Sequence, residues 1–262
     1  VTDSIAPGLR STGMVTGAIW SDVDADGLPD LLLTHEWGPV AVWKNTGGKL
    51  VNFTDESGLS GLLGWWTGIA AADVDEDGDL DFAVGNMGLN VKYHATKEKP
   101  YLAYYGDLDG SGVPRFVEAC HEDGGLFPVR GKSCSTHAIP SLAKKFSTYH
   151  AFASAALREI YAPTRLQSAQ RLAINELASG LLLNDGNGRF SYRALPRVAQ
   201  ASAVFGLTFG DFDADGHQDL ALAQNFFSTQ PETGRIAGGL GLILRGSGDG
   251  TFEPMRLDES GF

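Results

Sequence analysis

Three short segments of the sequence carry closely spaced aspartates around one glycine. Each has the form Asp-x-Asp-x-Asp-Gly-x-x-Asp, which places carboxylates at positions 1, 3, 5 and 9 of a nine-residue loop. The glycine at position 6 permits the sharp turn that lets the carboxylates converge. Several hard oxygen ligands in a flexible loop suit Ca²⁺ better than Mg²⁺ or a transition metal. The pattern therefore predicts one calcium site in each of loop 1 (residues 22–30), loop 2 (73–81) and loop 3 (211–219).

The ligands are expected to be the aspartates of each loop together with the residue at position 7, which offers its backbone carbonyl. At position 7 of loop 3 the main chain of a histidine is expected to matter more than its ring. The predicted metal ligands are Asp22, Asp24, Asp26, Leu28 and Asp30 in loop 1, Asp73, Asp75, Asp77, Asp79 and Asp81 in loop 2, and Asp211, Asp213, Asp215, His217 and Asp219 in loop 3.

These loops differ from the EF-hand, which needs a bidentate glutamate at position 12 and a helix on either side. Position 12 is Leu33, Val84 or Leu222 here, and it lies in a short apolar run that favours a strand. We therefore expect each loop to join two strands, with the aspartate at position 9 replacing the missing glutamate. The alternative is a surface turn without metal, which three copies in one register make less favourable.

A fourth segment, loop 4 (residues 107–115), has the same outline but lacks two of the ligands. Asp107 and Asp109 occupy positions 1 and 3, Ser111 stands at position 5 and Arg115 at position 9. A guanidinium is permanently charged, so it repels a divalent cation and can pair with the carboxylates instead. We predict three calcium ions rather than four, with Arg115 near Asp107 and Asp109 or turned to solvent.

The repeat extends beyond the loops. A glycine stands five residues before the first aspartate of each loop, at Gly17, Gly68 and Gly206. A second unit, in which an apolar run is followed by an Asn/Gly turn and an aromatic residue, recurs at residues 42–53, 181–190 and 242–252, and each copy is typical of a hairpin. One loop hairpin plus one such hairpin gives a four-stranded unit of roughly fifty residues, the size of a propeller blade.

With these motifs the chain resembles the FG-GAP/VCBS repeat family, whose calcium-loop blades also occur in integrin α-subunit heads. It is similar in particular to large bacterial VCBS-repeat proteins related to the cartilage acidic protein group. The resemblance implies an all-β propeller of about four four-stranded blades, as part of a larger ring, and a helical insertion. We expect the chain to be a segment of a longer protein.

The predicted organisation has three parts. Residues 1–119 form blades with two calcium loops, the second of them ending in a hairpin at residues 101–119. Residues 120–177 form a largely helical insertion, because apolar residues recur there three to four residues apart. Residues 178–262 form blades with one calcium loop.

Composition excludes several classes of function. The net charge is −12, and thirteen aspartates lie in the three loops (four, five and four), so three Ca²⁺ ions would bring the charge to −12 + 3 × 2 = −6. A basic footprint for nucleic acid is absent. No apolar run approaches the roughly 20 residues that span a bilayer. The sequence contains neither a Gly-x-Ser-x-Gly elbow nor a His-Glu-x-x-His motif, which favours a function without catalysis.

We therefore expect an extracellular, cell-surface or periplasmic scaffold that binds calcium and serves adhesion or contact with a protein partner. The alternative is a carbohydrate-binding propeller or the scaffold of a polysaccharide lyase. A glycan would stack on Trp65 or Trp66, which point to opposite faces if they lie in a strand, whereas Trp20 and Trp43 are predicted to lie in the core. The two cysteines, Cys120 and Cys134, are predicted to form a disulfide in an oxidising compartment, with two free thiols as the alternative.

Overall fold

The computed structural model describes residues 2–122, 124–229 and 233–260, and it divides into two compact units. Unit 1 comprises residues 1–94 and 176–262, and unit 2 comprises residues 95–175. Within the described residues, unit 1 contains three antiparallel sheets built on one four-stranded pattern, and unit 2 contains a fourth sheet and short helices. The protein is therefore mostly β, with the blade-like sheets that the sequence predicted, although one of the four sheets belongs to unit 2.

Each sheet of unit 1 places one of the three Asp-rich loops between its first two strands. Blade 1 has the order β1 (Met14–Ser21), β2 (Asp30–Pro39), β3 (Ala41–Asn45) and β4 (Leu50–Asn52), and β5 (Leu63–Trp65) pairs with the far end of β2. Blade 2 has the order β6 (Gly68–Ala72), β7 (Asp81–Gly85), β12 (Gly180–Asn184) and β13 (Phe190–Ala194). Blade 3 has the order β14 (Val204–Gly210), β15 (Asp219–Gln224), β16 (Leu242–Gly246) and β17 (Phe252–Pro254).

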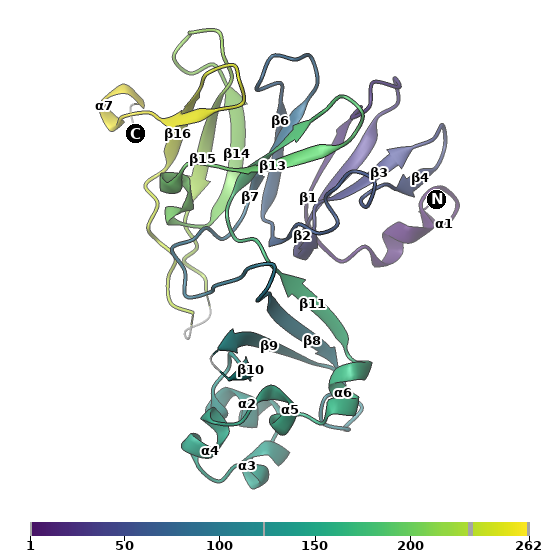
Figure 1. The fold of residues 1–262 in the computed structure, drawn as a ribbon, viewed down its shortest axis with the longest axis vertical. Coiled ribbons are helices and arrows are strands. Elements are labelled where there is room, and N and C mark those ends of the chain that lie inside the picture. The colour runs from purple at the N-terminus through teal and green to yellow at the C-terminus, as the bar shows by residue number, and fades with distance from the viewer. Residues whose placement is uncertain (1, 123, 230–232, 261–262) are drawn as a thin grey trace. The chain divides into compact units, whose positions relative to one another are not determined.

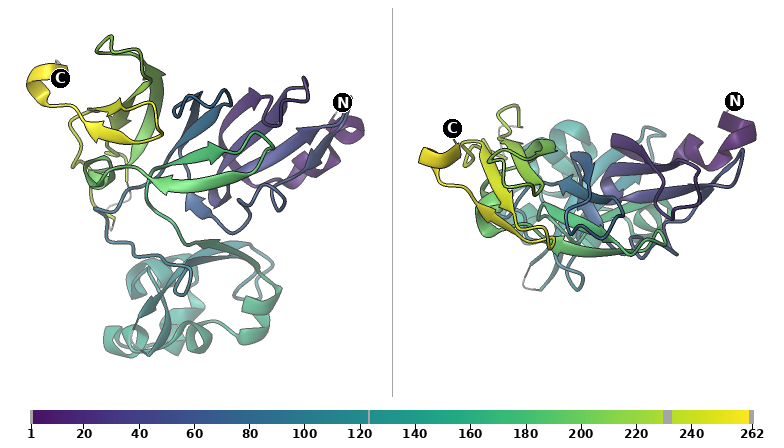
Figure 2. Two further views of the ribbon diagram at one scale, coloured as in Figure 1. Left: turned by 45° about the horizontal axis from the view of Figure 1, so that its top comes forward. Right: turned by 90° about the horizontal axis from the view of Figure 1, so that it is seen from above.

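The three sheets stand side by side, with β6 lying between β1 and β14 (Figures 1 and 2). The recurring glycines allow this close approach of the inner strands. A Cβ on Gly17 would lie 3.5 Å from the Cα of Gly68, and a Cβ on Gly68 would lie 3.3 Å from the carbonyl oxygen of Phe205. Two apolar clusters fill the spaces on either side of blade 2, one around Trp66 and Phe82 and one around Leu220.

Short helices and turns complete unit 1. They are α1 (Thr2–Ile5), the 3₁₀ helices η1 (Pro7–Ser11) and η2 (Arg197–Ala201), and α7 (Leu257–Ser260).

Unit 2 is a small sheet covered by helices. The sheet has the order β10 (Gly125–Pro128), β9 (Arg115–Glu122), β8 (Tyr101–Gly106) and β11 (Gln170–Ile174). Five helices lie between β10 and β11, namely α2 (Lys132–Ala138), α3 (Ser141–Lys145), α4 (Tyr149–Ala153), α5 (Leu157–Ile160) and α6 (Pro163–Ser168). Apolar side chains from both layers form one core, among them Leu102 and Ala119 from the strands and Leu142, Phe152 and Leu157 from the helices.

The insertion is longer than the sequence indicated. It spans residues 95–175 rather than 120–177, and the hairpin at residues 101–119 forms β8 and β9 of the inserted sheet instead of the outer half of blade 2. That half is supplied by β12 and β13, because β12 pairs with β7 through Leu181 opposite Ala83 and Leu182 opposite Phe82. Blade 2 is thus assembled from two segments with a complete unit inserted between them.

The predicted disulfide does not form in this structure, where Cys120 and Cys134 are not bonded to each other. Cys120 lies on β9 and its thiol contacts the carboxylate of Glu122 at 3.7 Å. Cys134 lies in helix α2. The two residues belong to different layers of unit 2, each placed by its own element.

The tryptophans are distributed differently from the prediction at one position. Trp43 is buried as expected, whereas the Trp20 side chain is 58% exposed. Trp66 is completely buried and packs edge-on against Tyr192. Trp65 is half-buried, its ring neighbours those of Trp37 and Tyr93, and its indole N–H donates to Glu36. Trp66 therefore offers no ring face to a sugar.

Candidate metal centres

The three loops share one backbone conformation. Position 4 is in the left-handed region in each, with φ of 56° at Ala25, 58° at Glu76 and 62° at Ala214, and the glycine at position 6 also has positive φ. A residue other than glycine in this region costs on the order of 1 kcal/mol. Three loops that all adopt it are held by a common set of contacts.

The aspartate at position 1 accepts hydrogen bonds from the backbone inside the loop. In loop 1, Asp22 accepts from the N–H groups of Asp26 at 3.1 Å and Gly27 at 2.9 Å. Asp211 does the same in loop 3 for Asp215 and Gly216, both at 3.1 Å. In loop 2, Asp73 accepts from Gly78. The first carboxylate thus shapes the turn and also faces its centre.

The aspartate at position 9 is fully buried in all three loops. Asp30 accepts from Val23 N at 3.2 Å through Oδ2 and from Asn45 N at 2.7 Å through Oδ1, so it joins the loop to the third strand of the blade. Asp219 repeats this arrangement with Phe212 N at 2.8 Å and Gly246 N at 2.9 Å. Sequence reasoning assigned these residues to metal binding alone and missed their part in fixing the blade.

Burial and neighbouring carboxylates disfavour the ionised form in loop 2. Burial, followed by repulsion from Asp75 and Asp77, raises the pKa of Asp81 to about 6, although two backbone N–H groups oppose the shift. Burial also raises the pKa of Asp75, with repulsion from Asp77 and Asp73 as further causes. A bound cation would relieve this repulsion.

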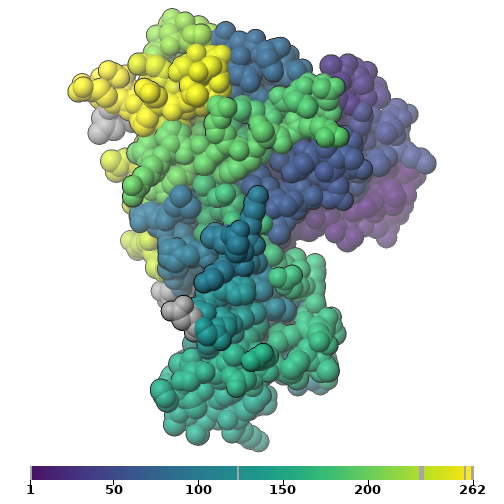
Figure 3. Space-filling view, in the orientation of Figure 1, coloured from purple at the N-terminus to yellow at the C-terminus, as the bar shows by residue number. Residues whose placement is uncertain are grey.

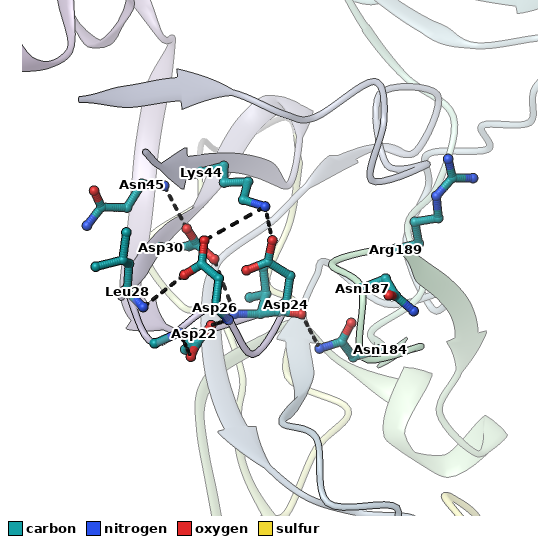
Figure 4. A network of polar contacts seen from close by, with 12 residues as sticks. Asp22, Asp24, Asp26, Leu28, Asp30, Lys44, Asn45, Asn184, Asn187 and Arg189 are labelled. Carbon is teal, nitrogen blue, oxygen red and sulfur yellow. Dashed lines mark hydrogen bonds and ion pairs between the residues drawn. The ribbon is translucent and has the colours of Figure 1, made fainter. Parts of the chain in front are cut away.

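Positions 1, 3 and 9 converge in every loop. Oxygen atoms of Asp22, Asp24 and Asp30 lie within 4.8 Å of one another, and the same holds for Asp73, Asp75 and Asp81 and for Asp211, Asp213 and Asp219. Position 5 is turned differently, because Asp26, Asp77 and Asp215 each accept a hydrogen bond from the N–H at position 7. The structure thus gathers three of the five predicted ligands of each loop and holds the other two beside them (Figure 4, for loop 1).

The carboxylate oxygens provide a test of whether a metal ion fits. Asp24 Oδ1, Asp73 Oδ1 and Asp75 Oδ1 are buried and have no hydrogen-bond partner within the described chain. A buried carboxylate oxygen without a partner is costly. A cation at the convergence point would satisfy these atoms, so the donor sets of loop 1 and loop 2 fit Ca²⁺, and loop 3 shares their convergence of three carboxylates.

Loop 4 carries arginines where the others gather carboxylates. Arg115 lies 3.9 Å from Asp109, as predicted, and Arg165 of helix α6 lies 3.1 Å from Asp107. A hydrogen bond from Ser111, with Arg115 as a lesser cause, lowers the pKa of Asp109. Over the part of the chain that the structure describes, loop 4 does not bring three or more possible ligand side chains within 4.8 Å of one another.

Adjacent blades contact one another through the metal loops. His217 of loop 3 pairs through Nδ1 with Glu76 of loop 2 at 2.5 Å, so its ring has a partner that the sequence did not reveal. The Asn184 side chain donates to the carbonyl of Val23 in loop 1 at 3.0 Å, and Arg193 donates to the carbonyl of Gly250 at 2.9 Å. Accordingly, the green β12–β13 hairpin lies against both neighbouring blades in the space-filling view (Figure 3).

A row of four-stranded antiparallel sheets, each with an acidic loop between its first two strands, defines a propeller-like repeat protein. A comparison with known families matches residues 22–84 and 172–222 to the FG-GAP-like repeat. The matched residues, which include loop 1, loop 2 and loop 3, are similar to FG-GAP-like repeats. A search of curated proteins finds no match. Among the described residues, no helix has the length and apolar character needed to cross a membrane.

Proposed function

We propose that this protein is an extracytoplasmic, calcium-stabilised scaffold without catalytic activity, which presents its loops and unit 2 to a protein partner. FG-GAP-like repeats suggest a protein-interaction or adhesion scaffold of the propeller type. The observation that carries the calcium part is the set of orphaned, buried carboxylate oxygens at Asp24, Asp73 and Asp75.

Calcium would act on structure in this proposal. Asp22, Asp24 and Asp30, with their counterparts in loop 2 and loop 3, would hold the ion, and it would offset the charge gathered at each turn. The loop residues already position the strands, since the ninth-position aspartates connect each loop to the third strand of its blade. The ion would hold the aspartate side chains at positions 1 and 3 in one conformation. Free Ca²⁺ is abundant outside the cytoplasm, which agrees with the weak, open sites expected of extracellular modules.

Calorimetric titration of metal-free protein with Ca²⁺ tests the proposal. We expect three ions per chain, with saturation at millimolar calcium or below. The matched variant carries Asn at position 3 of all three loops, Asp24→Asn, Asp75→Asn and Asp213→Asn, and should take up none. A wild-type protein that shows no heat of binding and no competition with Tb³⁺ would overturn the calcium proposal.

A further inference from the structure

Two of the three metal loops already contain a cation from their own blade. In loop 1 the ammonium of Lys44 donates to Oδ2 of Asp24 and lies 3.9 Å from Oδ2 of Asp26 (Figure 4). In loop 3 the guanidinium of Arg245 pairs with Oδ2 of Asp213 at 2.5 Å. Both contacts are made to position 3, one of the three converging carboxylates.

These cations occupy equivalent places in the fold. Lys44 follows Trp43 in the chain. Trp43 pairs with Leu31, which is the residue directly after the ninth-position aspartate of loop 1. Arg245 follows Leu244 in the chain. Leu244 pairs with Leu220, which is the residue directly after the ninth-position aspartate of loop 3. Each cation therefore stands across the blade from the end of its loop.

Blade 2 has a leucine at this place. Leu182 pairs with Phe82, which follows Asp81, so the residue equivalent to Lys44 and Arg245 is Leu183. Leu183 packs against the apolar cluster between blades 2 and 3. Loop 2 also has a fifth aspartate, Asp79, at position 7.

The charge on the three loops therefore differs. Loop 1 and loop 3 each combine four aspartates with one contacting cation, −4 + 1 = −3, whereas loop 2 has five aspartates, one glutamate (Glu76) and a neutral residue at that place, −5 − 1 = −6. The affinity of oxygen-ligand sites for Ca²⁺ rises with ligand charge. A cation within contact distance of a ligand must also be displaced or must repel the incoming ion.

Loop 2 is also more covered than loop 3, whereas the converging carboxylates of loop 1 and loop 2 are buried to a similar degree. The turn of blade 3 reaches loop 2, since Gly250 N donates to Val74 O at 2.9 Å and a Cβ on Gly250 would lie 3.6 Å from the Cβ of Asp75. In loop 3, by contrast, Asp211 and Asp213 are exposed. Water competes less, and charge interactions are stronger, at a covered site.

We infer that Lys44 and Arg245 are internal counter-ions that weaken calcium binding at loop 1 and loop 3, so that loop 2 is the high-affinity site and fills first. The inference rests on the calcium binding proposed above. In the absence of metal the two cations partly neutralise their loops, which keeps loop 1 and loop 3 in shape. At loop 2 the equivalent residue is Leu183, which supplies no charge to offset the carboxylates.

The experiment is calorimetric titration with Ca²⁺ at fixed ionic strength on single-site variants. Lys44→Met and Arg245→Met should each tighten one of the weaker binding events by about tenfold, because removing one nearby charge is worth roughly 1.4 kcal/mol at a partly exposed site. Lys49→Met and Arg197→Met, at exposed positions, are the matched controls for the change in net charge and should leave the affinities within about twofold. Leu183→Lys should weaken the tightest event, and Leu183→Met controls for its packing.

Assignment of the events uses the deletion of one carboxylate per loop. Asp75→Asn should abolish the tightest event, whereas Asp24→Asn and Asp213→Asn should each remove a weaker one. Even if the wild type binds three ions, unchanged affinities in Lys44→Met and Arg245→Met would overturn the inference. Loss of a weak event, instead of the tightest one, in Asp75→Asn would overturn it as well. Absence of any binding in the wild type would instead contradict the calcium proposal on which the inference rests.

Discussion

The backbone N–H of Asn184 donates a 2.8 Å hydrogen bond to Oδ1 of Asp81, although the two residues are 103 positions apart in the chain. The other carboxylate oxygen of Asp81 accepts from Val74 inside loop 2. A single buried side chain thus connects the metal loop to a strand that follows the whole inserted unit. The equivalent contacts in blades 1 and 3 span only 15 and 27 residues. Blade 2 can close only after unit 2 has returned the chain to it.

The ninth-position aspartate should contribute to stability even without metal. Asp219→Ala removes the acceptor of two backbone N–H groups, one buried and one partly buried, and we expect the free energy of unfolding in EDTA to fall by about 2–4 kcal/mol. Asp215→Ala deletes an exposed carboxylate from the same loop and should cost less than about 1 kcal/mol. Urea denaturation of both variants checks this. Equal losses would show that Asp219 has no separate structural role.

Stability should fall as the pH drops through the titration of His35. Burial lowers the pKa of this ring below its ordinary value of 6.5, and the Pro39 carbonyl opposes the shift only in part. The folded state therefore keeps the neutral ring, while the unfolded chain takes up a proton as the pH falls below 6.5. The contribution is complete above that value and is lost below it.

Chemical denaturation of wild type and His35→Gln between pH 7.5 and 6.0, in excess calcium, measures this contribution. We expect the wild type to lose more stability over the interval than the variant does. The ring also contacts Thr12 at 3.1 Å and Pro39 at 2.9 Å, so the variant should be less stable at pH 7.5 as well. Parallel pH profiles would contradict the assignment.

Cys120 should react slowly with thiol reagents in the native protein. Burial, reinforced by the carboxylate of Glu122, raises its pKa to about 11, so little thiolate exists at pH 8. The alkylation rate of Cys120, followed by peptide mass spectrometry, should increase towards pH 11, and Glu122→Gln should raise it at pH 8. Denatured, unreduced protein should take up two alkyl groups, since no disulfide joins the two cysteines. If the denatured, unreduced protein takes up no alkyl group, the predicted disulfide between Cys120 and Cys134 is present after all.

Loop 4 should become a calcium site only when both arginines that pair with its aspartates, Arg115 of the loop and Arg165 of helix α6, are replaced. Ser111→Asp with Arg115→Asp supplies the missing carboxylates, but Arg165 would still pair with Asp107. Adding Arg165→Gln should raise the stoichiometry from three ions to four in a calcium titration. The double variant without Arg165→Gln is the control and should stay at three. A fourth ion bound by the wild type would contradict our account of this loop.

The local parts of this fold could be predicted, and the pairing between distant segments could not. Short apolar runs beside the Asp-rich loops indicate β1 with β2 and β14 with β15 correctly, since these pairs are adjacent in the chain. The hairpins β8–β9 and β12–β13 both consist of an apolar run, a turn and a second run. Only the long-range pairing of β12 with β7 decides which of them completes blade 2.

The sequence predicted the converging aspartates of the candidate site correctly, but it did not predict the cationic side chains that contact them. The spacing of Asp22, Asp24 and Asp30 indicates their convergence, because the loop itself brings them together. The contacts of Lys44, Arg165 and Arg245 with the acidic loops depend on strand register and helix placement, which the spacing does not contain. Trp20 shows the same limit, since its apolar neighbours predicted burial and the strand turns its ring to solvent.

Thermal unfolding in 5 mM calcium and in EDTA tests the central claim most directly. Each occupied site adds about 2.7 kcal/mol at a hundredfold excess of calcium over its dissociation constant. We predict a melting temperature clearly higher in calcium than in EDTA, and a triple variant with Asp24→Asn, Asp75→Asn and Asp213→Asn that no longer responds to calcium. Identical melting curves for the wild type in calcium and in EDTA would contradict the claim that these loops are structural calcium sites.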